Sequence, residues 1–202
     1  MSNSNFYLDF ENKFRGSTDE ISRRLNAYDL LLAKVLKFAK GKKILDIGCG
    51  RGEWLKKCQE LGFLCEGVEK DDAMVDACLN KKLKIYKGDA INILEGLESS
   101  QFSIVSLFHV IEHLTHDQLL KVLKESKRIL TDDGILILET PSIDNLIVAS
   151  RQFFLDPTHI SPINPDALLF FLDYLGFNFS KYFFLNPGQF SDKQPSNISS
   201  IL

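Results

Sequence analysis

Residues 44–52 read Ile-Leu-Asp-Ile-Gly-Cys-Gly-Arg-Gly, and this stretch decides the fold. The first four residues predict a short buried strand. The glycines that follow let the chain turn tightly and let its backbone approach a ligand that a Cβ atom would obstruct. Glu69 stands nineteen positions after Gly50. An acidic residue about 20 positions after the glycines ends the second strand of a nucleotide-binding fold and binds the hydroxyl pair of a ribose. The stretch therefore predicts an α/β fold that binds a nucleoside-bearing cofactor.

The acidic residue inside the motif distinguishes between cofactors. A dinucleotide fingerprint, G-x-G-x-x-G, admits a pyrophosphate onto a helix N-terminus. This chain instead has D-x-G-x-G-x-G, with Asp46 ahead of the glycines. A carboxylate there repels a pyrophosphate and attracts a cationic amine. S-adenosylmethionine (SAM) carries an adenosine, a sulfonium and an α-ammonium group and has no phosphate. The spacing therefore predicts SAM, with S-adenosylhomocysteine (SAH) as product, over the alternative of an NAD-dependent oxidoreductase.

The bulk composition is that of one globular domain. The chain has 202 residues, of which 45% are hydrophobic and 25% charged, and a formal net charge of −3. We therefore expect one full core and no general nucleic-acid binding. We expect neither a secretory signal nor a membrane span, because no apolar run approaches the roughly 20 residues of a membrane helix. The cysteines lack metal-type spacing, which predicts free thiols in the reducing cytoplasm. They are Cys49, Cys58, Cys65 and Cys78.

Strand and helix signals alternate along the chain. Strands are expected over residues 43–47, 63–69, 83–87, 102–108, 135–139 and 177–185. Helices are expected from the capping box at 17–20 towards Gly41, and over 51–61, 71–79, 116–130 and 166–175, with a turn at 132–134 and a long loop over 141–165. This alternation predicts a doubly wound, mostly parallel α/β sheet.

The same pattern divides the chain into three regions. Residues 1–40 are expected to form a cap segment and a helix, 41–185 the SAM-binding domain, and 186–202 a flexible polar tail. Because no clear seventh strand follows, the sequence leaves open whether the chain is a fragment of a longer protein. The sequence leaves the oligomeric state open.

Ligands of open α/β sheets bind at the carboxyl ends of the strands. The first strand end is expected near the methionine part of SAM, the second near its ribose and the third near its adenine, while the fourth lies beside the sulfonium. Asp89 can instead be only a helix cap, since Gly-Asp-Ala is also a capping pattern. The cofactor-binding residues predicted from these strand ends are Asp46, Gly48, Cys49, Gly50, Glu69, Lys70, Asp89, Ala90 and Phe108.

Five further motifs carry a resemblance to a known family. They are Phe14-Arg-Gly-Ser17, Gly50-Arg-Gly-Glu-Trp54, His109-Val-Ile-Glu-His-Leu114, Glu139-Thr-Pro141 and Asp156-Pro-Thr-His159. With the strand-end motifs, the chain resembles a class I SAM-dependent methyltransferase. More narrowly, it resembles the methyltransferase domain of bacterial O-antigen chain-terminating and related polysaccharide-modifying enzymes.

This resemblance implies a Rossmann-like fold, a SAM cofactor and transfer of its methyl group to an acceptor oxygen. The implied acceptor is a small molecule or glycan, namely a terminal sugar or its phosphate in surface polysaccharide biosynthesis. The resemblance also implies that Arg15, in the N-terminal segment, pairs with the methionine carboxylate of SAM.

Four residues are candidates for catalysis on the acceptor side. His109 ends the fourth strand, where it could serve as a base, as a donor to a phosphate or as a wall of the SAM pocket. Glu112 and His113 follow it and either act on the acceptor or only hold the loop. His159 lies in the long loop at the same sheet edge, where loops often contact acceptors. His116 is expected on the surface.

Two alternatives remain open. Glu112, His113 and His159, with or without His109, could gather around one ion, as a similar cluster does in some RNA 2′-O-methyltransferases. We do not predict a metal, but that alternative would make the chain an RNA or small-molecule methyltransferase. The other alternative is a non-catalytic SAM-binding module of a larger assembly enzyme.

Overall fold

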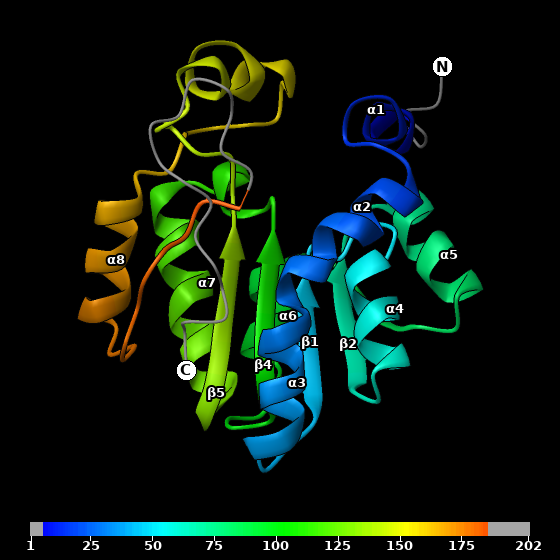
Figure 1. The fold of residues 1–202 in the computed structure, drawn as a ribbon, viewed down its shortest axis with the longest axis vertical. Coiled ribbons are helices and arrows are strands. Elements are labelled where there is room, and N and C mark those ends of the chain that lie inside the picture. The colour runs from blue at the N-terminus through cyan, green and yellow to red at the C-terminus, as the bar shows by residue number, and fades with distance from the viewer. Residues whose placement is uncertain (1–5, 186–202) are drawn as a thin grey trace.

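The computed structural model describes residues 6–185 and shows a sheet with helices on both faces (Figure 1). The strands are β1 Lys43–Ile47, β2 Leu64–Glu69, β3 Lys84–Lys87, β4 Phe102–Phe108 and β5 Leu130–Glu139. The α-helices are α1 Phe6–Phe14, α2 Thr18–Leu25, α3 Asp29–Phe38, α4 Glu53–Glu60, α5 Asp72–Asn80, α6 Ala90–Glu95, α7 His116–Ile129 and α8 Pro165–Tyr174. The short helical turns are η2 Asn26–Tyr28, η3 Ile111–His113, η4 Val148–Gln152 and η5 Phe153–Leu155. The predicted doubly wound α/β fold is confirmed.

The order of the strands indicates where a ligand can bind. They lie in the order β3-β2-β1-β4-β5, and every pairing among the described residues is parallel. The chain runs outward from β1 to β3 in one direction and from β4 to β5 in the other, so the order reverses between β1 and β4. In open parallel sheets this reversal opens a crevice at the carboxyl ends of the strands, where ligands bind. The strand ends point towards the side on which α1 and residues 141–164 lie (Figure 1).

Two cores hold the sheet between its helical layers. Side chains alternate along a strand, so neighbouring residues of β1 and β4 face opposite sides. Ile44 and Ile104 pack with α3 and α4, whereas Leu45 and Val105 pack with α6 and α7. Both faces of these strands are therefore buried, which explains why β4 reads as an almost continuous apolar run.

The N-terminal region differs from the expectation in two ways. The helix α1 forms within the part of residues 1–40 that was expected to be only a cap segment. The helix that follows the capping box is not continuous, because the 3₁₀ turn η2 separates α2 from α3. The capping box itself is confirmed: the Ser17 hydroxyl accepts from the Glu20 N–H, and the Glu20 carboxylate accepts from the Ser17 N–H. Helical spacing of apolar residues does not reveal such a break, since a 3₁₀ turn displaces the stripe only slightly.

The expected turn at 132–134 lies within β5 rather than before it. Phe102 of β4 pairs with Leu130, and the next pair joins Ile104 to Ile135. Two steps along β4 thus match five steps along β5, and the extra residues bulge from the ladder. The Asp-Asp-Gly signal marks this bulge, and β5 is longer than predicted.

The strand predicted over 177–185 is wrong, because these residues pair with no strand of the described sheet. Their aromatic side chains have high β propensity, but a strand also needs a partner in register. Phe179 has a φ of 58°, which interrupts an extended conformation, and its side chain is 97% exposed. The tail predicted over 186–202 lies outside the described residues.

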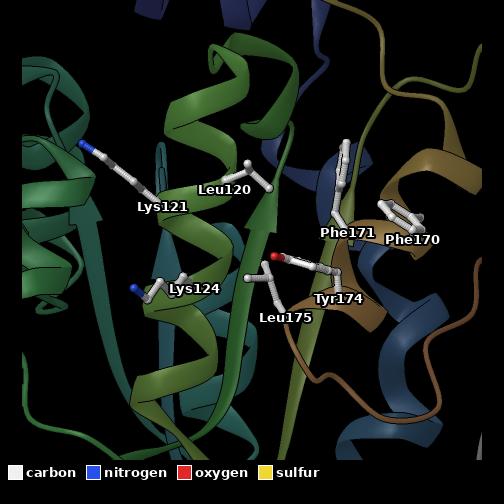
Figure 2. Close-up of a pocket in the computed structure, with 7 residues that line it drawn as sticks. All are labelled: Leu120, Lys121, Lys124, Phe170, Phe171, Tyr174 and Leu175. Atoms are coloured by element: carbon white, nitrogen blue, oxygen red, sulfur yellow. The ribbon is translucent and has the colours of Figure 1, made fainter.

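The helix α8 packs one face against the core beneath α7 and leaves Phe170 and Tyr174 exposed. Between α7 and α8 lies an apolar groove of about 320 Å³ (Figure 2). Its lining residues are Leu120, Lys121, Lys124, Phe170, Phe171, Tyr174 and Leu175. The groove lies on helix faces and contains none of the predicted site residues. Within residues 6–185, no helix is both long and apolar enough to cross a membrane.

We expect Gly52→Ala to destabilise the protein more than Gly62→Ala. Both glycines have positive φ, 79° and 98°, so both substitutions carry the strain of that region, about 1–2 kcal/mol. A Cβ on Gly62 meets no atom within 4 Å, whereas one on Gly52 would lie 2.5 Å from Leu83 Cδ1 and 2.8 Å from Cys78 Sγ. Overpacking at Gly52 should add about 1–3 kcal/mol, measured by urea unfolding. Equal unfolding midpoints for the two variants would contradict the packing described.

Candidate active site

The loop after β1 is held by the carboxylate that ends β2. The N–H of Gly50 donates to Glu69 Oε2 at 2.9 Å. The N–H groups of Lys70 and Asp71 donate to Glu69 Oε1 at 2.8 and 3.0 Å. Glu69 is buried and so links the end of β2 to the glycine loop. This linkage sets the direction of the loop backbone at the crevice.

Asp46 lies where the strand order reverses. It is the register partner of Ser106 on β4, and its Oδ1 accepts a hydrogen bond from Ser106 Oγ at 2.7 Å. Asp46 is 3% exposed. Burial raises the pKa of Asp46 to about 7, although Ser106 and Arg15 act to lower it. Near neutral pH the carboxyl is balanced between its two forms, and a cationic ligand beside it would favour the charged one.

An ion pair from the N-terminal segment lies over the glycine loop. Arg15 Nη1 lies 2.6 Å from Glu11 Oε1, and Glu11 is buried. Both side chains come within 3.8 Å of the position that a Cβ would take on Gly50. The structure therefore brings Arg15 to the predicted cofactor crevice and brings Glu11 with it.

The end of β3 provides a helix cap. Asp89 precedes Ala90 at the start of α6, and its Oδ1 accepts from the N–H groups of Ile91 and Asn92 at 3.0 and 3.2 Å. The capping interpretation of Asp89 is confirmed, and its exposed carboxylate remains at the sheet edge. The side chain of Lys70, at the end of β2, is exposed as well.

Two predicted cofactor residues are buried in the first core. Cys49 is buried, and contact with Cys78 together with burial raises the pKa of its thiol. Phe108 packs against Tyr28 and Trp54, with ring centroids 5.4 and 5.0 Å apart. Phe108 thus belongs to an aromatic cluster below the crevice and supports the strand end from beneath.

His109 lies between two carboxylates at the end of β4. Its Nδ1 lies 3.3 Å from Glu112 Oε1, and its Nε2 lies 3.5 Å from Glu139 Oε1. Tyr28 Oη donates to Glu139 Oε2 at 2.5 Å. Burial lowers the pKa of His109, but Glu112 and Glu139 outweigh it and raise the pKa to about 9. At neutral pH the ring is an imidazolium, which favours the donor role considered for His109 over the role of a base.

The long loop after β5 brings His159 to Glu112 and His113. Glu112 is fully buried, and its Oε2 accepts from Thr140 Oγ1 at 3.0 Å. The N–H of Ile160 donates to the Glu112 carbonyl at 2.9 Å, which ties the loop to η3. One ligand atom from each of Glu112, His113 and His159 lies within 4.8 Å of the others. The gathering of these three residues is therefore observed, while His116 lies on the surface as expected.

Sequence reasoning missed four residues of the site: Glu11, Tyr28, Ser106 and Glu139. Glu139 ends the fifth strand, so the strand-end rule that selects Glu69 also selects it. Glu11 stands four positions before Arg15, a spacing at which oppositely charged side chains pair on a helix. Tyr28 and Ser106 carry no local signal, because their partners are distant in sequence.

The crevice is lined mainly by carboxylates. Asp46, Glu69 and Glu139 stand at three strand ends, and the cationic side chains near them include Arg15, Lys70 and His109. The end beside Asp46 and Glu69 suits a ligand with positive charge and with hydroxyl groups that donate to carboxylates, and it does not suit a pyrophosphate. His109 makes the end of β4 the cationic part of the crevice.

Comparison with known proteins agrees with this fold. Residues 20–181 match the family model described as a methyltransferase domain. A SAM-dependent methyltransferase from Archaeoglobus fulgidus is 34% identical, with a TM-score of 0.74 over 85% of this chain and 74% of that chain. A possible histamine N-methyltransferase from Thermotoga maritima, 19% identical with a TM-score of 0.58, covers 83% of this chain and 80% of its own and shares the fold.

Among curated proteins, the chain is similar to a ubiquinone biosynthesis O-methyltransferase from Coxiella burnetii. The two are 27% identical over 106 residues, which is 50% of this chain and 44% of the relative. The chain thus spans less than half the length of that relative. The Coxiella burnetii relative is named for transfer to oxygen, and the Thermotoga maritima protein is named for possible transfer to nitrogen. The fold alone therefore does not define an acceptor.

We expect Asp46→Asn to stabilise the ligand-free protein at pH 8. The folded carboxyl has a pKa of about 7 against an ordinary value of 3.8. Stability from this group is therefore complete below pH 3.8 and is lost as the pH rises through about 7. Asparagine keeps an acceptor for Ser106 without the charge. In urea unfolding, the free energy of unfolding of the variant should exceed that of the wild type by up to about 4 kcal/mol at pH 8. At pH 5 the difference should be less than half of that. A difference that does not change with pH would contradict the buried charge.

Proposed function

This chain belongs to the methyltransferase domain family, and we propose that it transfers the methyl group of SAM to an oxygen of a glycan or sugar phosphate. The proposed setting is surface polysaccharide biosynthesis in the cytoplasm. Support for the acceptor class comes from the motifs that carry the resemblance, above all Asp156-Pro-Thr-His159, which lies outside the cofactor crevice. Support for an oxygen acceptor comes from the similarity to curated O-methyltransferases.

We assign SAM to the crevice between β1 and β4. Asp46 accepts from its α-ammonium group, and Arg15 pairs with its carboxylate from above Gly50. Glu69 Oε1 already accepts two N–H groups, but Oε2 accepts only one and has a further lone pair, so Glu69 can accept from one ribose hydroxyl and still hold the glycine loop. Asp89 can accept from the adenine amino group through Oδ2 while Oδ1 caps α6.

Methyl transfer from a sulfonium is an in-line displacement. The acceptor oxygen forms a bond to the methyl carbon, the carbon–sulfur bond breaks, and its electron pair remains on sulfur in SAH. The sulfonium charge is consumed, so the protein contributes chiefly by positioning the acceptor and excluding water. A neutral hydroxyl also needs a base for its proton, whereas a phosphate oxygen is already anionic and needs none.

The charge and the position of the His109 ring decide between these two acceptors. Its ring is cationic at neutral pH, its side chain is 39% exposed, and it stands at the end of β4 beside the proposed sulfonium position. An imidazolium donates to a phosphate and cannot take a proton from a hydroxyl. We therefore propose that the acceptor is a phosphate-bearing sugar and that His109 orients the phosphate by exchanging its 3.5 Å contact with Glu139 for an Nε2–H hydrogen bond to the phosphate.

We expect the protein with SAM to methylate a hexose phosphate in preference to the corresponding free hexose. Mass spectrometry should show a methyl phosphodiester, with SAH released in equal amount. His109→Gln should lower kcat/KM by about 10- to 100-fold, the value of a hydrogen bond to a charged group. His116→Gln, at a surface histidine outside the crevice, is the matched control and should retain activity. Transfer to the free hexose at an equal rate, or full activity of His109→Gln, would overturn the proposal.

A further inference from the structure

Three potential metal-ligand atoms converge beside the acceptor side of the crevice. The first belongs to Glu112, which is fully buried and whose Oε1 accepts no hydrogen bond. Oε1 faces His109 Nδ1 at 3.3 Å as an ion pair and His159 Nε2 at 4.0 Å. The ion pair with His109 offsets part of the cost of burying this carboxylate, and a cation bound closer to Oε1 would offset more of it.

The second atom is the Nε2 of His113. Thr158 Oγ1 donates its single hydrogen to Asp156 Oδ1 at 2.6 Å. The same oxygen lies 2.9 Å from His113 Nδ1 and can therefore only accept from it. The Nδ1 of His113 carries the hydrogen, and its Nε2 keeps a lone pair.

The third atom is the Nε2 of His159. Its Nδ1 lies 2.6 Å from the carbonyl oxygen of Phe153, which can only accept, so Nδ1 carries a hydrogen. The neutral ring then has its lone pair on Nε2, on the side of Glu112 and Asp156, whose nearest carboxylate oxygens are each 4.0 Å away. The two histidine rings lie edge to face, with centroids 4.6 Å apart.

These contacts reproduce the surroundings of a metal-binding histidine. Such a histidine donates its second N–H to a carbonyl, a carboxylate or another oxygen, which sets the tautomer and directs the free nitrogen at the ion. Phe153 and the Thr158–Asp156 pair serve His159 and His113 in this way. The three ligand atoms lie within 4.8 Å of one another. Around a tetrahedral ion with bonds of about 2.1 Å, ligand atoms are about 3.4 Å apart, so binding would draw these atoms closer together.

We propose that Glu112, His113 and His159 bind one divalent transition-metal ion of the zinc type. Two imidazole nitrogens and one carboxylate oxygen suit zinc, iron or nickel, whereas magnesium and calcium prefer oxygen ligands. Three protein ligands leave an open position, which is typical of sites that also bind a substrate. Because the cluster adjoins His109, the open position would take an oxygen of the acceptor. This role rests on the proposed methyl transfer, whereas binding of the ion does not.

Equilibrium dialysis tests the site without any acceptor. The chelator-treated chain is dialysed against zinc alone, and bound metal is measured by elemental mass spectrometry; we expect one zinc per chain. Glu112→Gln and His159→Ala should each weaken zinc binding at least 100-fold. Thr158→Val, which keeps all three proposed ligands but removes the hydroxyl that contacts His113 and Asp156, should weaken it about 10- to 100-fold. His116→Ala is the matched control and should bind zinc as the wild type does.

Calorimetric binding of SAH to each variant controls for folding and separates this proposal from the proposed function. Zinc binding lost with SAH binding retained supports the site, whatever the methyl-transfer assay shows. Absence of zinc binding by the wild type would overturn the proposal. Equal losses in His116→Ala and His159→Ala, or magnesium bound as tightly as zinc, would overturn it as well.

Discussion

The buried carboxylate of Asp46 is the constraint on which the site depends. Reversal of the strand order between β1 and β4 places Asp46 beside Ser106 and excludes water from the carboxylate. The glycine loop directly after it is held open towards the crevice by Glu69. A charge in that position costs stability in the free protein, and a bound cation offsets the cost. We propose that the same arrangement that costs stability in the free protein selects a ligand with an ammonium group.

Much of the cofactor side could be predicted from sequence, because its signals are local. The D-x-G-x-G-x-G stretch predicts a strand and its turn, and the distance to Glu69 predicts where the second strand ends. The alternation of elements predicts the sheet and its strand-end crevice. The prediction of a strand at 177–185 was wrong because strand formation depends on more than local sequence. The aromatic residues of this segment suit a strand, but the segment does not indicate whether another strand is available to pair with it in register. Likewise, the Asp-Asp-Gly signal in β5 marks a bulge, which only the pairing with β4 reveals.

The acceptor side depends on contacts between distant segments and was predicted less completely. The gathering of Glu112, His113 and His159 was considered from residue type alone, and the loop tied to η3 brings it about. The tautomers of the two histidines follow from Thr158 and Phe153, which carry no signal in the sequence. The raised pKa of His109 follows from Glu112, which is near in sequence, and from Glu139, which Tyr28 holds from the N-terminal region. Under the proposed function, the cofactor and the acceptor meet at the end of β4, beside the reversal of the strand order.

The most direct test of this account is calorimetric titration of SAH at pH 6 and pH 8, with wild type and Asp46→Asn measured side by side. With a pKa of about 7 in the free protein, Asp46 is about one-tenth ionised at pH 6. The account predicts wild-type binding about tenfold tighter at pH 8 than at pH 6, and weaker, pH-independent binding by the variant. Equal wild-type affinity at the two pH values, or an Asp46→Asn variant that binds SAH as tightly as the wild type, would contradict it.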